Sequence, residues 1–176
     1  MKRCALWLAA VLMMLLAAGP ALADETYAET PLTEASDQQR VNIQLAVEAL
    51  DGIVLNFEDA FSFNQLVGER SEERGFVLAT NGRGVDVVGG GVAQTATTLY
   101  LALMQRDDIE YSSIYTYNES FSAGYVESGY DAIATDYVNQ LDFAFNSYYE
   151  GTLTIYMWMT EDALCCYVVE DCEEVL

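Results

Sequence analysis

Three consecutive glycines lead directly into a helix-like stretch, and this part of the chain has the pattern best suited to chemistry. The sequence GGGVAQTATTLY runs from Gly89 to Tyr100. Glycine adopts backbone angles closed to other residues, so a ligand or another chain segment can approach closely. The first turn of a helix offers unpaired N–H groups and the positive end of the helix dipole, which lower the pKa of a cysteine or bind an anion. The residue at that position is Ala93, which carries no reactive group.

The same residues also have structural interpretations. The glycine run alone is more often a flexible corner than a site. Gln94 can bind a ligand or cap the helix, and Asp131 can bind a ligand or accept hydrogen bonds from the backbone of its own turn. The chain has no histidine, which excludes imidazole as a base or a metal ligand. Its cysteines lack the paired spacing of a zinc site, so we expect no metal and no cofactor.

Three blocks of sequence together resemble the VanW family, which is named from vancomycin-resistance gene clusters and is common in exported proteins of Gram-positive bacteria. The blocks are FSFNQLVGERSEERGF, GGGVAQTATTLY and YVESGYDA, and the resemblance runs from about Arg40 to Thr160. Family members usually have a cysteine where this chain has Ala93, and a histidine where, counting back from Tyr125, it has Glu119. The resemblance therefore implies the frame of a thiol-nucleophile site without its nucleophile or base.

The resemblance also implies a cleft, and it suggests which residues line it. The candidate binding residues are Gly89, Gly90, Gly91, Gln94, Asn118, Ser120 and Asp131. We expect a non-catalytic site that binds a peptidoglycan-related peptide or glycan, or an envelope protein. The alternative is a hydrolase of cell-wall material in which two carboxylates, Glu119 and Asp131, divide the acid and base roles.

The charge of the chain limits its partners. Its 176 residues include 28 acidic and 7 basic residues, for a net charge of −21. This charge repels nucleic acid phosphates and anionic lipids, so we expect no nucleic acid partner. It suits solubility, a basic partner or a calcium-binding structural role. Two acidic clusters could bind calcium, but neither has the spacing of a dedicated calcium loop. Their members are Asp107, Asp108 and Glu110 in the first, and Glu170, Asp171, Glu173 and Glu174 in the second.

Arg70 and Arg74 stand close together before a predicted strand, and they are noticeable in a chain with so few basic residues. Two interpretations are open. They can pair with surface carboxylates, or they can hold an anionic group of a ligand.

The N-terminus has the pattern of a secretory signal peptide. Lys2 and Arg3 precede an apolar run that ends in a small-x-small motif, so we predict cleavage after Ala23. The alternative is an uncleaved anchor, although the run is short for a membrane span. Cleavage removes two of the seven basic residues and none of the 28 acidic ones, which makes the net charge −23. We expect a secreted, extracytoplasmic protein of a Gram-positive cell envelope, without a stable membrane span.

Three cysteines follow the predicted cleavage site. Export permits a disulfide. One of the adjacent pair Cys165 and Cys166 can reach Cys172 across a predicted turn at residues 170–171, which would leave the third cysteine free or intermolecular.

Periodicity predicts a single domain of mixed class after the signal peptide. The acidic, threonine-rich composition of residues 24–37 predicts a flexible lead-in. The resemblance assigns residues 38–176 to the VanW-like domain. Ser36 and Gln39 fit a capping box for a helix that ends at Gly52. A second helix is predicted near residues 96–104. Strands are predicted at residues 53–55, 76–79, 85–88, 111–117, 141–145, 152–160 and 164–169. This order is typical of an α+β fold, with two main helices packed on a largely antiparallel sheet.

Overall fold

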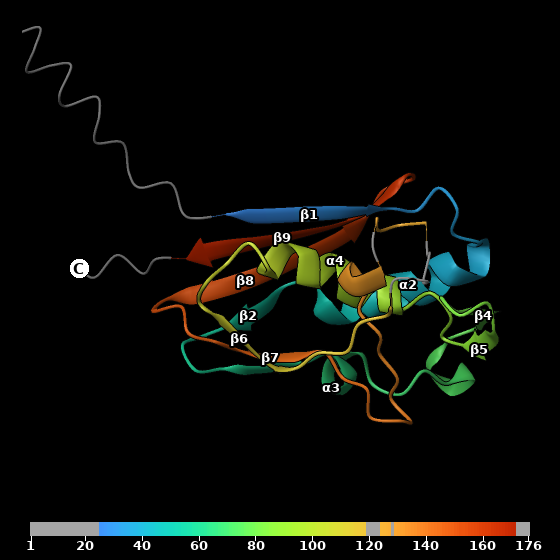
Figure 1. Cartoon of the computed structure of the whole chain (residues 1–176), viewed down its shortest axis with the longest axis horizontal. Helices are drawn as coiled ribbons and strands as arrows, with labels where there is room; N and C mark the ends of the chain where they lie inside the picture. Colours follow the sequence, from blue (N-terminus) through green and yellow to red (C-terminus); the bar gives the residue numbers. More distant parts are fainter. Residues whose placement is uncertain (1–24, 119–123, 128, 172–176) are drawn as a thin grey trace, which may run out of the picture.

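The computed structural model describes residues 25–118, 124–127 and 129–171, and the α+β prediction is confirmed (Figure 1). The described residues form three antiparallel sheets and three α-helices, joined by turns and loops. The helices are α2 (Asp37–Leu50), α3 (Phe63–Val67) and α4 (Ala93–Leu103), with short 3-10 turns η1 (Glu72–Arg74) and η2 (Gly129–Asp131). The predicted signal peptide, residues 1–23, lies outside the described residues.

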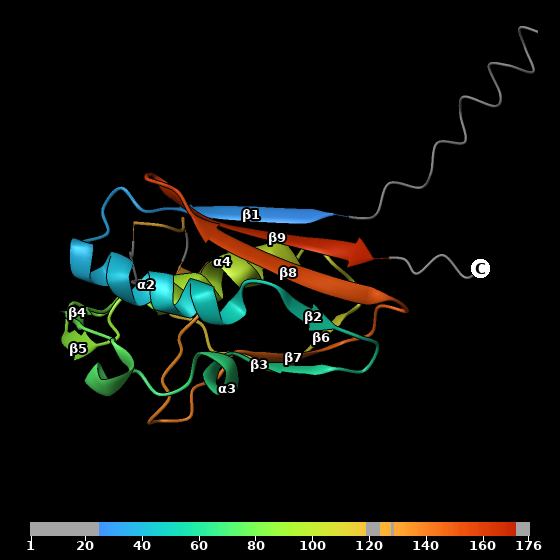
Figure 2. The same cartoon turned by 180° about the vertical axis from the view of Figure 1, so that it is seen from behind.

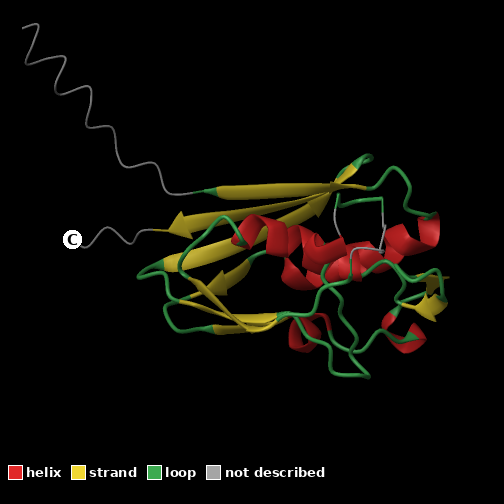
Figure 3. Cartoon of the chain, viewed as in Figure 1, coloured by secondary structure: helices red, strands yellow, loops and turns green. Residues whose placement is uncertain are grey.

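The largest sheet has four strands in the order β1-β9-β8-β2, all antiparallel. These strands are β1 (Thr26–Pro31), β9 (Ala163–Asp171), β8 (Thr152–Met159) and β2 (Ile53–Leu55). A three-stranded sheet consists of β3 (Ala60–Ser62), β7 (Ala144–Ser147) and β6 (Ile109–Ser113), and a hairpin of β4 (Leu78–Thr80) and β5 (Asp86–Val88). Figure 3 shows the two long helices lying between the sheets, with loops gathered at one end.

The core lies where α2 and α4 pack against the four-stranded sheet. Alternation along β8 places Leu153, Ile155 and Met157 on the inner face, each at most 1% exposed. The apolar faces of the helices cover them with Ile43, Ala46, Val47 and Leu50 from α2, and with Ala96, Leu99, Ala102 and Leu103 from α4. Aromatic rings of Phe61, Phe143 and Phe145 fill the space toward the three-stranded sheet.

The predicted start of the first helix is confirmed in detail. The Ser36 side chain accepts a hydrogen bond from the amide of Gln39, and the Gln39 side chain accepts one from the amide of Ser36. This reciprocal pair satisfies two N–H groups that a helix start leaves unpaired. It also holds the first turn of α2 in place beside the glycine run.

The prediction of a flexible lead-in over residues 24–37 is wrong for Thr26–Pro31, which form β1. This strand pairs with β9 along its full length, from Thr26 opposite Val168 to Pro31 opposite Ala163. The buried hydroxyl of Thr30 forms a hydrogen bond with Thr98 of α4. The acidic composition concealed a strand whose alternate residues face the core and whose partner lies more than 130 residues away.

The predicted turn at residues 170–171 is also wrong. β9 continues to Asp171, with Glu170 opposite Leu153 of β8. The proposed disulfide needed this turn to bring Cys172 back to the adjacent cysteines. Cys165 and Cys166 are free and buried, and burial raises the pKa of the Cys166 thiol well above its usual range. Cys172 lies outside the described residues.

One member of each acidic cluster contacts the same buried cation. Arg106 forms ion pairs with Asp108 of the first cluster and Glu170 of the second. Its guanidinium also lies over the ring of Tyr149. Within the described residues, no group of three or more His, Cys, Asp or Glu side chains is placed to hold a metal ion. Over the same part of the chain, no helix has the length and apolar character needed to cross a membrane.

Candidate functional site

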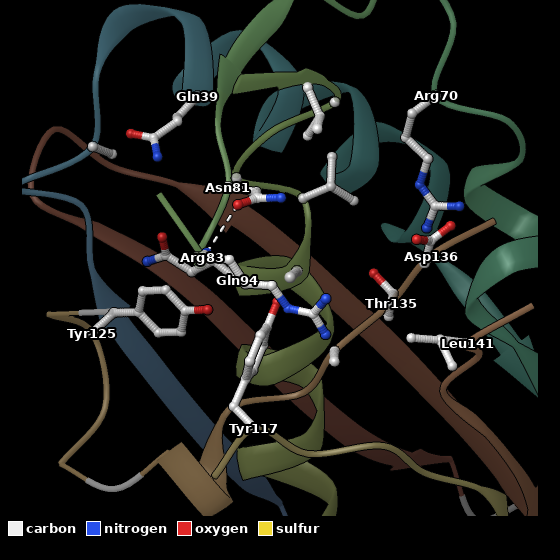
Figure 4. A pocket seen from close by; sticks show the side chains of 18 of the residues that line it. Gln39, Arg70, Asn81, Arg83, Gln94, Tyr117, Tyr125, Thr135, Asp136 and Leu141 are labelled. Atoms are coloured by element: carbon white, nitrogen blue, oxygen red, sulfur yellow. Dashed lines mark hydrogen bonds between the residues drawn. The ribbon is translucent and has the colours of Figure 1, made fainter. Parts of the chain in front are cut away.

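A cleft of about 820 Å³ opens at the N-terminal end of α4 (Figure 4). Its walls come from the connection from β1 into α2, the β4–β5 hairpin, the glycine run with the first turn of α4, and residues 134–141. Glu69 and Arg70, which follow α3, and Tyr117, Gly124 and Tyr125 complete them. The cleft therefore lies at the position that the glycine pattern indicated.

Each glycine of the run allows one close approach that a side chain would block. A Cβ atom on Gly89 would lie 2.5 Å from the Cβ of Arg70, and one on Gly91 would lie 3.0 Å from the Cβ of Gln39. A Cβ atom on Gly90 would overlap the carbonyl oxygen of Ala79 in β4. The run thus brings Arg70, the hairpin and the start of α2 against the N-terminus of α4.

A buried amide that the sequence reasoning missed holds this arrangement together. Asn42 of α2 is fully buried, and its Nδ2 donates to the carbonyls of Val77 and Gly90, at 2.9 Å each. Its Oδ1 accepts from the amide of Val77 at 2.8 Å. The available signal was a polar residue next to Ile43 on an otherwise apolar helix face. Such a residue is buried only when its hydrogen bonds are satisfied.

The first turn of α4 faces the cleft without a side-chain cap. Its N-cap is Val92, which makes no capping hydrogen bond. The amides of Val92 and Gln94 donate to carbonyls of the glycine run. Within the described residues, the amide of Ala93 has no recorded acceptor. The half-buried Ala93 lines the cleft, so the family's cysteine position faces this space.

Gln94 lines the cleft, but its amide group is used for structure. Its Nε2 donates to Thr30 Oγ1 at 3.0 Å and to the carbonyl of Pro31 at 2.9 Å. The side chain is only 5% exposed. Gln94 therefore ties the start of α4 to β1, which is neither of the two roles considered for it from the sequence.

Two guanidinium groups line the cleft, those of Arg70 and Arg83. Nη1 of Arg70 donates to Asn64 Oδ1 at 2.8 Å and to the carbonyl of Gly68 at 3.0 Å. Its Nη2 is buried and has no partner within the described residues. Burial lowers the pKa of Arg70 to about 10, and the nearby carboxylates of Asp142 and Asp136 oppose this shift. Arg70 therefore remains cationic at neutral pH.

Arg74, the other arginine of the predicted pair, does not line the cleft. Its Nη1 donates to the carbonyls of Val67 and Glu69, which closes the C-terminal end of α3. Neither Arg70 nor Arg74 forms an ion pair with a described carboxylate. Pairing with surface carboxylates is thus not observed there, and the position of Arg70 fits the alternative of an anion-binding group.

Arg83 lies at the tip of the β4–β5 hairpin, across the cleft from two tyrosines. Its guanidinium carbon lies 5.9 Å from the ring centre of Tyr117. Figure 4 shows the phenol groups of Tyr117 and Tyr125 pointing toward the same part of the cleft as this guanidinium, while Arg70 and Asp136 lie together on the other side. Burial raises the pKa of both tyrosines, and for Tyr125 a hydrogen bond with Thr97 offsets only part of this rise. Both side chains therefore stay neutral hydrogen-bonding groups near pH 7.

The structure brings together only part of the predicted site. Gly89, Gly91 and Gln94 line the cleft, whereas Gly90, Asn118 and Asp131 do not. Glu119 and Ser120 lie outside the described residues. The half-buried Asp131 belongs to η2, so the carboxylate pair proposed for a hydrolase does not have this member in the cleft wall. Among the described residues, the carboxylates that line the cleft are Glu34, Glu69 and Asp136.

Restoring a thiol at the family's cysteine position tests the environment of the helix N-terminus. We expect the thiol of Ala93→Cys to have a pKa below the usual value of about 8.5, because the helix dipole favours a thiolate. The rate of iodoacetamide alkylation against pH measures this pKa. The parent chain supplies the background from its own cysteines, of which Cys165 and Cys166 are buried. A pKa at or above the usual value would show that the cleft does not favour an anion at this position.

Most of the described part of this chain is similar to known proteins. A family model described as "VanW like protein" matches residues 38–169. The "Uncharacterized protein YoaR" of Bacillus subtilis (strain 168) is 32% identical over 117 residues, which are 65% of this chain. The chain covers 37% of the length of that relative. No solved structure matches.

Proposed function

The chain belongs to the VanW-like protein family, and we propose that it is a non-catalytic, extracytoplasmic domain whose cleft binds a peptidoglycan-derived peptide. The observation that carries the proposal is the distribution of positive charge. The whole chain has seven basic residues against 28 acidic ones, and two of its arginines, Arg70 and Arg83, line one cleft. Two guanidinium groups at one place in so acidic a protein favour a ligand with an anionic group.

The other cleft residues support a peptide ligand. Carboxylates from Glu34, Glu69 and Asp136 line the same space, so a ligand that carries both an ammonium and a carboxylate matches both charges of the wall. The amide side chains of Gln39, Asn81 and Asn139 also line the cleft, and although each makes structural hydrogen bonds, its remaining donor and acceptor capacity is available to peptide groups. A concave site with a few convergent polar groups is typical of small-ligand binding.

The residue at the family's cysteine position supports binding without catalysis. Ala93 has no nucleophile, and the chain has no histidine to act as a base. The N-terminal end of α4 still offers the amide of Ala93 and the positive end of the helix dipole. We therefore expect the ligand carboxylate to bind between this amide and the guanidinium of Arg83.

Two matched peptides test carboxylate recognition. A peptidoglycan stem pentapeptide with a free C-terminus should bind saturably in calorimetry. Its C-terminal amide should bind about ten-fold more weakly, because a charge-assisted hydrogen bond contributes about 1.5–3 kcal/mol. Equal affinity for the two peptides, or no saturable binding of either, would contradict the proposal.

The variant Arg83→Gln tests whether Arg83 is the residue that recognises the ligand carboxylate. It should weaken binding of the free-carboxylate peptide about ten-fold and remove most of the preference over the amide, since the two changes act on one interaction. Val85→Thr is the control, because Val85 is 54% exposed on the same hairpin and does not line the cleft. If Arg83→Gln kept the full preference for the carboxylate, the carboxylate would not bind at Arg83.

A further inference from the structure

The outer face of the four-stranded sheet carries exposed aromatic side chains that the cleft does not use. Among the β8 residues that alternate with the buried core positions, Tyr156 and Trp158 are 44% and 41% exposed, whereas Thr154 is 5% exposed. Tyr27 of β1 is 43% exposed, and Val54 of β2 is 51% exposed. Soluble proteins rarely expose contiguous apolar surface of this kind unless it contacts a partner.

The strand register makes these residues neighbours. Tyr156 lies opposite Tyr167 of β9, and Tyr27 lies opposite the same residue from the other side. The rings of Tyr27 and Trp158 have their centres 6.4 Å apart. We call the outward-facing residues Tyr27, Val54, Tyr156, Trp158 and Tyr167 the aromatic face. In Figure 2, β8 and β9 pass in front of α4, so this helix packs on the opposite side of the sheet.

Carboxylates border the aromatic face, and no basic residue belongs to its strands. The Tyr27 hydroxyl donates to Glu29 at 2.5 Å, and Tyr167 forms a hydrogen bond with Glu25. The four strands of this sheet contain no lysine or arginine. Aromatic rings and carboxylates without any cation form a surface that is electrostatically complementary to a positive partner.

We propose that the aromatic face binds a basic polypeptide segment. Ammonium and guanidinium groups are attracted to the faces of Trp and Tyr rings, and Glu25 and Glu29 supply opposite charges at the border. The aromatic side chains also provide the buried centre that protein interfaces favour. This proposal concerns the opposite side of the sheet from the helices and does not depend on what the cleft binds.

The test uses Trp158 as its own reporter. The full chain contains two tryptophans, and Trp7 lies in the predicted signal peptide, so either cleavage or Trp7→Phe leaves Trp158, on the aromatic face, as the only one. Titration with a hexa-arginine peptide should change the Trp158 emission saturably, and a hexaglutamate peptide should not. The double change Tyr27→Thr with Tyr156→Thr should weaken hexa-arginine binding about ten-fold, because it removes two rings from the contact.

Matched variants separate this site from general attraction to an acidic surface. Tyr148→Thr is the control, because Tyr148 is 41% exposed, lies just beyond β7 of the other sheet and also has a hydrogen bond to a glutamate. Glu25→Gln with Glu29→Gln keeps every ring and should also weaken binding. Equal binding by all variants would overturn the proposal, since it would indicate only non-specific charge attraction. A saturable response to neutral chitohexaose, with none to hexa-arginine, would also overturn it and assign the face to a glycan.

Discussion

Asn42→Leu should lower the free energy of unfolding by about 2 kcal/mol or more, because leucine leaves two backbone groups without partners at about 1–3 kcal/mol each. Those groups are the carbonyl of Gly90 and the amide of Val77, whereas the carbonyl of Val77 keeps its hydrogen bond from the amide of Gly89. The loss should be larger than that of a typical surface substitution, since no water replaces the amide at a position with no exposure. Urea denaturation measures it directly.

The same substitution should also disturb the cleft. Asn42 connects α2 to both ends of the segment that runs from Val77 to Gly90, and that segment carries Arg83. We expect weaker binding of the stem pentapeptide in any Asn42 variant that still folds. Gln44→Ala on the same helix is the control, because Gln44 is exposed and bonds only to Glu48 within its own helix. A loss for Asn42→Leu no greater than for this control would contradict the role assigned to Asn42.

The second large effect is expected for Gly90→Ala. The added methyl group would overlap the carbonyl oxygen of Ala79, and it would lie 2.5 Å from the Ala79 carbonyl carbon and 3.0 Å from that of Thr80. These are backbone atoms, so relief requires β4 to move away from the glycine run. We expect a loss of about 3–4 kcal/mol, in the range of severe steric changes at buried positions.

Gly84→Ala is the matched control for Gly90→Ala. Gly84 has a φ angle of +73°, but a Cβ atom there would meet nothing within 4 Å. Its cost should be about 1 kcal/mol from backbone strain alone. Thermal unfolding of the two variants compares the effect of crowding with the effect of conformation. Equal losses would show that close packing of Gly90 against β4 is not what the glycine run provides.

Local patterns predicted the elements whose signals lie within a few residues. The capping box of Ser36 and Gln39 marked the start of α2, and strict alternation marked β8. The strands predicted at residues 76–79 and 85–88 correspond to the paired β4 and β5. Each of these features depends on contacts that the segment makes with itself or with its immediate neighbour.

Features that depend on distant partners could not be predicted in the same way. β1 is a strand because β9 lies beside it, and its own composition is that of a polar linker. The same holds for the site. The glycine run was visible in the sequence, but Arg83, Tyr117 and Asp136 lie in turns and loops and carry no local pattern. They line one cleft only because the fold brings distant parts of the chain together. From the sequence, Gln94 was expected to bind a ligand or to cap the helix. Its hydrogen bonds to β1 depend on a strand that was not predicted.

If the VanW-like frame around Ala93 forms a cleft that binds a carboxylate-bearing peptide without catalysis, the amide chemical shifts of ¹⁵N-labelled protein should report it during a titration with the stem pentapeptide. We expect saturable shifts at Gly91, Ala93 and Arg83, small shifts at Tyr156 and Trp158, and an intact peptide at the end of the experiment. Shifts confined to the aromatic face, no shifts at all, or a cleaved peptide would rule this function out.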